Sequence, residues 1–133
     1  MNREVLKMKK QTLVENLGIH FLEVEKGAII ATMPVDERTI QPFGYLHGGA
    51  SVALAETVAS YGAAQLIDPA KEICFGLEIN ANHIRAKQDG QVTATAEVLH
   101  HGKSTMVWDV KIRDEEGQLI CVSRCTIAVV PKK

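Results

Sequence analysis

The sequence lacks a dominant charge, a paired set of cysteines and a long apolar run free of charged residues. With 15 Lys and Arg against 16 Asp and Glu, the formal net charge is −1, which argues against a nucleic-acid binder because such proteins normally have a basic face. Of the three cysteines, Cys121 and Cys125 lie four residues apart in an expected strand, too far apart to bridge. We expect all three, Cys74 included, to be small buried side chains in a reducing compartment, with a reactive thiol as the alternative.

No segment predicts export or a membrane span. Residues 1–10 carry five charges and no long apolar run, so we expect no signal peptide. The most apolar stretch, residues 48–67, contains Glu56, which would be costly in lipid. We therefore expect a cytoplasmic protein with no membrane or nucleic-acid partner. Its 133 residues suit one domain, residues 1–133, with 46% apolar residues to supply the core.

The hydrophobic pattern predicts an α+β fold. Residues 3–17 indicate one or two short helices, and residues 47–66 one long helix that ends before Asp68–Pro69. Alternating or apolar runs predict strands at residues 21–25, 28–35, 73–84, 91–100, 106–112 and 119–130. This order predicts a curved antiparallel sheet around one helix. Because one helix cannot cover both faces of a long sheet, we expect a partner subunit.

The start of the long helix carries the first functional signal. The helix begins at His47-Gly48-Gly49, and neither glycine has a side chain to cap the first-turn N–H groups. We expect these donors to stay available to a ligand, where the positive helix dipole suits a developing oxyanion. The alternative is a tight turn packed against the sheet.

Glu56 carries the second signal. No Lys or Arg occurs between Arg38 and Lys71, so Glu56 is exposed, paired with a distant arginine, or buried without a partner. Burial of a carboxyl group favours its protonated form, which suits acid–base catalysis. Ser60, one turn on, either orients Glu56 or a water, or is a small residue chosen for close packing.

The spacing of these groups predicts a composite site. Glu56 lies eight residues after Gly48, about 12 Å along a helix. One reacting carbon must lie within about 3–4 Å of both nucleophile and oxyanion donor. If both groups act, they come from different subunits of a dimer.

These residues carry a family resemblance. Gln41-Pro-Phe-Gly-Tyr-Leu-His-Gly-Gly-Ala-Ser, followed by Glu56, resembles the hotdog-fold aryl-CoA and proofreading thioesterases. The resemblance is strongest to the bacterial dihydroxynaphthoyl-CoA thioesterases of menaquinone synthesis and the enterobactin-pathway proofreading enzyme. It covers nearly the whole chain after Gly18, through Glu78-Ile-Asn-Ala-Asn-His83, Leu99-His-His-Gly102, Val107-Trp108 and Ser123-Arg124.

The resemblance implies hydrolysis of an acyl-CoA, in particular an aryl- or hydroxyaryl-CoA, with no cofactor because coenzyme A is part of the substrate. It implies that Glu56 is the nucleophile or general base and that the Gly48 N–H polarises the thioester carbonyl. Supporting roles are implied for Gln41 near that carbonyl, His47 at the acyl end, Ser60 beside the carboxylate or attacking water, and His83 near the pantetheine and acyl pocket. It also implies a homodimer that often forms a homotetramer as a dimer of dimers. Tyr45 and Thr57 occupy positions that vary in such families, which leaves pocket shape open.

Donors for the phosphates of coenzyme A are expected at strand ends. The candidates are Arg85, Lys87, His101 and the turn Gly102-Lys103-Ser104, each of which is otherwise ordinary surface. His100 and His101 point to opposite faces of a strand and no zinc-type spacing occurs, so we expect no metal site.

Three alternatives are kept open. The first is a thioesterase acting on acyl or aryl carrier proteins. The second is a non-catalytic acyl-CoA-binding hotdog protein, which would normally need an appended DNA-binding domain. The third is a hotdog dehydratase or hydratase, which needs an Asp/His pair on the helix, whereas Glu56 has no helical His neighbour.

Overall fold

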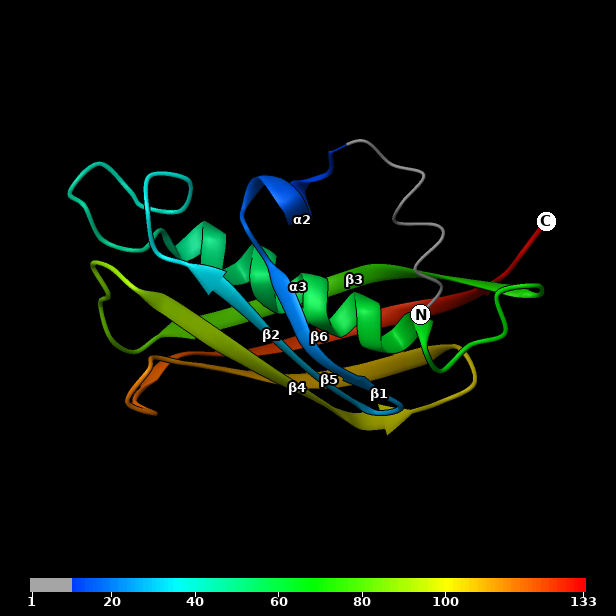
Figure 1. Cartoon of the computed structure of the whole chain (residues 1–133). Coiled ribbons are helices and arrows are strands. Elements are labelled where there is room, and N and C mark those ends of the chain that lie inside the picture. Colours follow the sequence, from blue (N-terminus) through cyan, green and yellow to red (C-terminus); the bar gives the residue numbers. More distant parts are fainter. Residues whose placement is uncertain (1–10) are drawn as a thin grey trace.

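A computed structural model describes residues 11–133, in which one long helix lies in the curve of an antiparallel sheet (Figure 1). The elements, in chain order, are α2 (Leu13–Asn16), β1 (His20–Glu25), β2 (Ala28–Pro34), α3 (Gly48–Ala64), β3 (Glu72–His83), β4 (Gln91–His101), β5 (Thr105–Arg113) and β6 (Leu119–Pro131). Each neighbouring pair in the order β1-β2-β4-β5-β6-β3 is antiparallel. This confirms the predicted hotdog fold of the α+β class. Part of the helix expected over residues 3–17 lies outside the described residues.

The alternation of β5 builds the floor of the core. Its inward side chains, Met106, Trp108, Val110 and Ile112, are fully buried. Trp108 packs directly on α3 at Gly62, where an added Cβ would overlap the indole ring. Residue 62 therefore lets the helix approach the sheet closely. Along α3, Leu54, Ala55, Val58, Ala59 and Ala63 complete the contact with the sheet.

Two strands, β1 and β3, form the edges of the sheet. β3 is long and its apolar side chains are poorly covered: Phe75 is 57% and Leu77 62% exposed, and Ile73 is exposed as well. Between the pairs Gly76–Ile127 and Glu78–Thr126 the register shifts, so Leu77 is the extra residue of a β-bulge. A single chain thus leaves an apolar strand edge uncovered.

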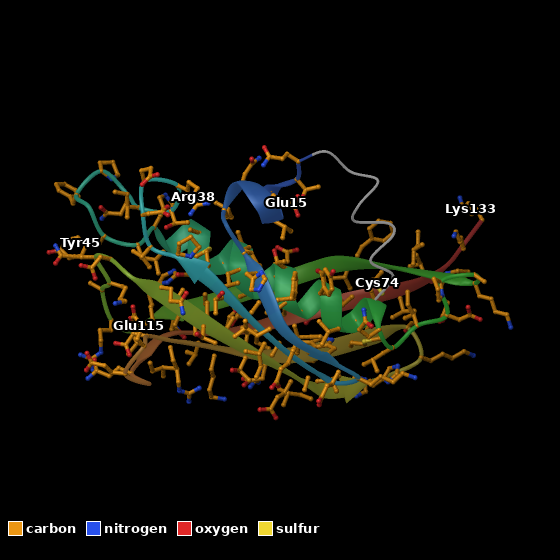
Figure 2. All side chains as sticks on the ribbon, viewed as in Figure 1. Glu15, Arg38, Tyr45, Cys74, Glu115 and Lys133 are labelled. Atoms are coloured by element: carbon orange, nitrogen blue, oxygen red, sulfur yellow. The ribbon has the colours of Figure 1, made fainter. Side chains whose placement is uncertain are left out.

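The two ends of the sheet differ. The N-terminus of α3, the preceding loop and the β5–β6 turn share one end, while the β4–β5 turn lies at the other (Figure 1). Figure 2 shows Tyr45 and Glu115 at the first end and Cys74 towards the second. No helix within residues 11–133 is long and apolar enough to cross a membrane.

Candidate active site

A pocket of about 400 Å³ opens at the N-terminus of α3. Its lining residues are Gln41, Tyr45, Leu46, Gly48, Ser51, His83, Ile84, Arg85, Ala86 and Ile120. The structure therefore brings together four of the residues predicted for the site: Gln41, Gly48, His83 and Arg85. The apolar lining from Leu46, Ile84 and Ile120 was missed, because each lies far from the others in sequence and only the fold assembles them.

The first turn of α3 has one free backbone donor at the pocket. His47 is the N-cap, and its Nδ1 accepts a hydrogen bond of 2.7 Å from the Gly49 N–H. The N–H groups of Ala50 and Ser51 donate to the His47 carbonyl. The expectation that both glycine donors stay available is thus wrong for Gly49, because the His47 ring accepts its hydrogen bond. Gly48 keeps an N–H without a hydrogen-bond partner in residues 11–133.

The cap also determines the tautomer of the neutral His47 ring. A ring nitrogen that accepts a hydrogen bond carries no proton, so Nδ1 is bare and the proton of the neutral imidazole is on Nε2. The side chain is exposed and does not line the pocket. In the structure His47 is the N-cap that stabilises the start of α3. It was expected to shape the acyl end of the site, but it is not among the residues that line the pocket.

His83, the last residue of β3, lies over Gly48. A Cβ on Gly48 would come within 2.8 Å of His83 Nε2, so the absent side chain admits the imidazole. Gly48 and His83 both line the same pocket. Two hydrogen-bonding groups thus converge where the helix dipole is positive, which suits a carbonyl oxygen that gains negative charge.

Gln41 shapes the loop beside this pair. Its Oε1 accepts hydrogen bonds from the N–H groups of Phe43 (2.6 Å) and Tyr45 (3.3 Å), and its own N–H donates to the Tyr45 carbonyl. Since both side-chain contacts are donors, the amide is oriented with oxygen towards the loop. Gln41 also lines the pocket.

Glu56 lies two turns along α3, away from the pocket lining. It is half-buried and makes no hydrogen bond or ion pair within residues 11–133. The alternative of a distant arginine partner is therefore wrong for this part of the chain. Its carboxylate contacts Gly76 of β3. Ser60, one turn on, is also half-buried, and the structure shows no hydrogen bond between the two residues.

The surroundings of Glu56 include a cysteine rather than a cation. Burial raises the pKa of the Cys125 thiol to about 12, and the negative charges of Glu56 and Glu78 add to the effect. Burial also raises the pKa of Cys74 and Cys121. All three are free. A raised pKa suppresses the reactive thiolate, which argues against the alternative of a nucleophilic cysteine.

Glu56 and Gly48 lie in different parts of one subunit. They are separated by eight residues of helix, about 12 Å of axial rise. The residues of β3 that lie beside them are also far apart. Gly76, beside Glu56, and His83, beside Gly48, are separated by seven residues, roughly 20 Å along a strand. A single thioester carbon cannot contact both groups in one chain.

The residues expected to bind the phosphates of coenzyme A lie at two opposite ends of the sheet. Arg85 lines the pocket, whereas His101, Gly102, Lys103 and Ser104 lie at the β4–β5 turn, at the opposite end of the sheet (Figure 1). The Gly102 N–H donates to the Thr105 carbonyl, so this backbone donor is not available to a phosphate as expected. Lys103 and Ser104 are exposed.

Lys87 is not a free cation either. Its side chain is only 16% exposed and its Nζ lies 2.7 Å from Glu115 Oε1. The hydrogen bond with this carboxylate raises the pKa of Lys87. The candidate Lys87 is therefore already paired with a carboxylate from the β5–β6 turn and is not a free donor for a phosphate. Within residues 11–133, no three His, Cys, Asp or Glu side chains form a group that could hold a metal ion.

The curved antiparallel sheet around one long helix defines a hotdog-fold protein. Residues 43–121 match the family model of the thioesterase superfamily, and the chain belongs to this family. It is 60% identical over 121 residues to a 1,4-dihydroxy-2-naphthoyl-CoA hydrolase of Listeria monocytogenes, covering 91% of this chain and 98% of the relative.

Solved structures agree with this assignment. A thioesterase variant from Pseudomonas aeruginosa superposes with a TM-score of 0.92 at 42% identity, covering 98% of this chain and 94% of the other. A thioesterase from Haemophilus influenzae gives 0.90 at 44% identity, covering 98% and 92%. The protein is a thioester hydrolase.

Proposed function

We propose that the protein hydrolyses aryl- or hydroxyaryl-CoA thioesters to the free acid and coenzyme A, in sites that each combine two subunits. The observation that carries the proposal is the separation within one chain: the free Gly48 N–H faces a pocket, and the unpartnered Glu56 carboxylate lies elsewhere on the helix. Each half contains one part of the machinery that acyl transfer needs.

The free edge of β3 offers a way to join the halves. If two copies pair antiparallel along β3 about a two-fold axis at Asn80, Gly76 of one copy lies opposite His83 of the other, because the bulge at Leu77 adds one residue between them. Gly76 is the neighbour of Glu56, and His83 is the neighbour of Gly48. The same pairing covers the exposed apolar residues Phe75 and Leu77. Such a pairing gives two equivalent sites per dimer, and further association of dimers would give the expected tetramer.

In this arrangement the chemistry is divided between subunits. The Gly48 N–H and the helix dipole stabilise negative charge on the thioester oxygen, with the Gln41 amide nearby. The partner subunit's Glu56 either attacks the carbonyl carbon, which gives an acyl–carboxylate anhydride that water then hydrolyses, or takes a proton from an attacking water. On both routes the coenzyme A thiolate leaves and is protonated.

The residues that line the pocket support the proposal of an aromatic acyl group. Leu46, Ile84 and Ile120 supply apolar walls and Tyr45 an aromatic ring, with Gln41 and Arg85 at hand for polar substituents. The relative from Listeria monocytogenes is named for a dihydroxynaphthoyl-CoA, a flat and hydroxylated substrate. Lys103, Ser104 and His101 are exposed at the far end of each subunit, where antiparallel pairing carries them towards the partner's half of the site.

A panel of thioesters tests the proposal. Purified protein is incubated with aryl-CoA, aliphatic acyl-CoA, aryl carrier-protein and enoyl-CoA substrates while free thiol is measured. We expect the largest kcat/KM for hydroxyaryl-CoA, since it fills the pocket. A preference for the carrier-protein substrate would show that the carrier protein, and not coenzyme A, is the natural leaving group. Hydration of the enoyl-CoA without release of thiol would contradict thioester hydrolysis.

A further inference from the structure

Within residues 11–133, no hydrogen bond or ion pair fixes the Glu56 carboxylate. A glutamate has three rotatable side-chain bonds, so a carboxylate without partners samples several positions. Catalysis requires one of them, because a displacement of about 1 Å can cost roughly 100-fold in rate. Within one subunit, packing and not polar contact therefore limits where this carboxylate lies.

Gly76 on β3 is the residue that faces it. A Cβ added to Gly76 would overlap Glu56 Oε2 and would lie 3.4 Å from Cδ and 4.0 Å from Cγ. The terminal atoms of Glu56 therefore occupy the space that any other residue at position 76 would fill.

A left-handed backbone does not account for glycine at this position. Gly76 is not among the glycines of positive φ, which in the described chain are residues 18, 27, 44, 90 and 117. Glycine inside a strand is destabilising compared with residues that carry a side chain. The bulge at Leu77 begins at Gly76, and a bulge bends its strand locally beside the carboxylate. The close approach of Glu56 is a requirement separate from the bulge, because it concerns the space that a side chain at position 76 would fill.

We propose that Gly76 is a positioning residue for thioester hydrolysis: the missing side chain on β3 forms the slot that holds the Glu56 carboxylate towards the substrate. The inference rests on the proposed function, in which Glu56 is the catalytic carboxylate. Gly76 itself contacts Glu56 and acts through it.

The test is Gly76→Ala. The group it displaces is the free end of a flexible side chain, so the fold tolerates the methyl by moving the carboxylate and not the backbone. We expect kcat to fall by roughly 100-fold, with KM little changed and the thermal midpoint level or higher. A crystal structure of the variant should show the carboxylate shifted away from β3.

Two matched backgrounds separate positioning from a general effect of the methyl. In Glu56→Asp the carboxylate is one methylene shorter, so adding Gly76→Ala should cost much less than in the wild-type chain. In Glu56→Ala the slot is empty, and the same methyl should cost nothing further. Such non-additivity is expected only of residues that act together.

The outcomes that contradict the two proposals differ. If Glu56→Ala retains full turnover, the proposed function itself fails. If Glu56→Ala is inactive but Gly76→Ala has normal kcat, only the positioning role is overturned. An equal penalty for Gly76→Ala in all three backgrounds, or loss of the oligomer in light scattering, would mean that the methyl acts on the strand edge and would also overturn it.

Discussion

Glu56 is a half-buried carboxylate with no partner in the described part of the chain. Leaving such a group without a hydrogen bond costs free energy, so its function opposes stability. We expect Glu56→Ala to lower kcat by roughly 10²–10⁴, with a thermal midpoint that is level or higher because alanine is the best helix former. Both quantities are measured on one sample, and Glu56→Gln serves as the control of similar shape. Retained turnover would remove Glu56 from the mechanism.

A residue could be predicted from the sequence when its role depends on its neighbours in the sequence. Gly48 and Gln41 stand within one short motif, and His83 in another, so the sequence predicted them and the pocket contains them. The role of Gly76 could not be predicted from the sequence, because it depends on contact with Glu56, a side chain 20 residues earlier that the fold places against it. The cap on Gly49 was missed for a different reason: histidine is not among the preferred N-cap residues.

Among the elements, the β3–β4 connection and the β5–β6 turn are joined by Glu115. Its carboxylate pairs with Lys87 at 2.7 Å and accepts the Gln91 N–H at 3.0 Å. These contacts, the Lys87 hydrogen bond foremost, lower the pKa of Glu115 from its ordinary value of 4.5 to about 2. Since Arg85 and Ala86 of the same connection line the pocket, the ion pair anchors one wall of the site.

The lowered pKa of Glu115 gives a pH dependence with a definite sign. Its stabilising contribution is fully present above 4.5, the unfolded value, and is lost as pH falls towards about 2, the folded value. We expect Glu115→Gln to have a lower thermal midpoint than wild type at pH 7, and the gap to shrink between pH 4.5 and 2. Added salt should also reduce the gap, because the pair is partly exposed. Glu116→Gln removes the same charge one residue on and should show no gap; equal behaviour of both variants would contradict the pairing.

The elements themselves were largely predictable because their patterns are local. The alternation from Met106 to Ile112 and the apolar helix that ends before Asp68–Pro69 both have the expected positions. The order of strands in the sheet, the exposed edge of β3 and the bulge at Leu77 were not predictable, since pairing partners are chosen by the whole sheet. The β4–β5 turn was predicted as a turn, but its distance from the pocket follows only from that order.

For the molecule as a whole, the separation of Gly48 and Glu56 predicts complementation between inactive chains. Gly48→Pro removes the free N–H at the first helical position, where proline is tolerated, and His47 already has the extended backbone that precedes proline (φ −70°, ψ 130°). The added ring also displaces His83, which belongs to the same half of the site. Gly48→Pro therefore disables the pocket half and leaves the Glu56 half of the same chain intact.

Mixing Gly48→Pro with Glu56→Ala chains tests whether the halves come from different subunits. If they do, each mixed dimer has one site with both defects and one site with neither, so unfolding and reassembly of an equal mixture should restore activity. Half of the dimers are then mixed, each with one of two sites working, which gives about a quarter of wild-type activity by random association. Each variant reassembled alone is the control and should stay inactive. If both chains fold and form dimers but the mixture gains nothing, each site lies within one chain, and the antiparallel pairing along β3 is wrong as the basis of the active site.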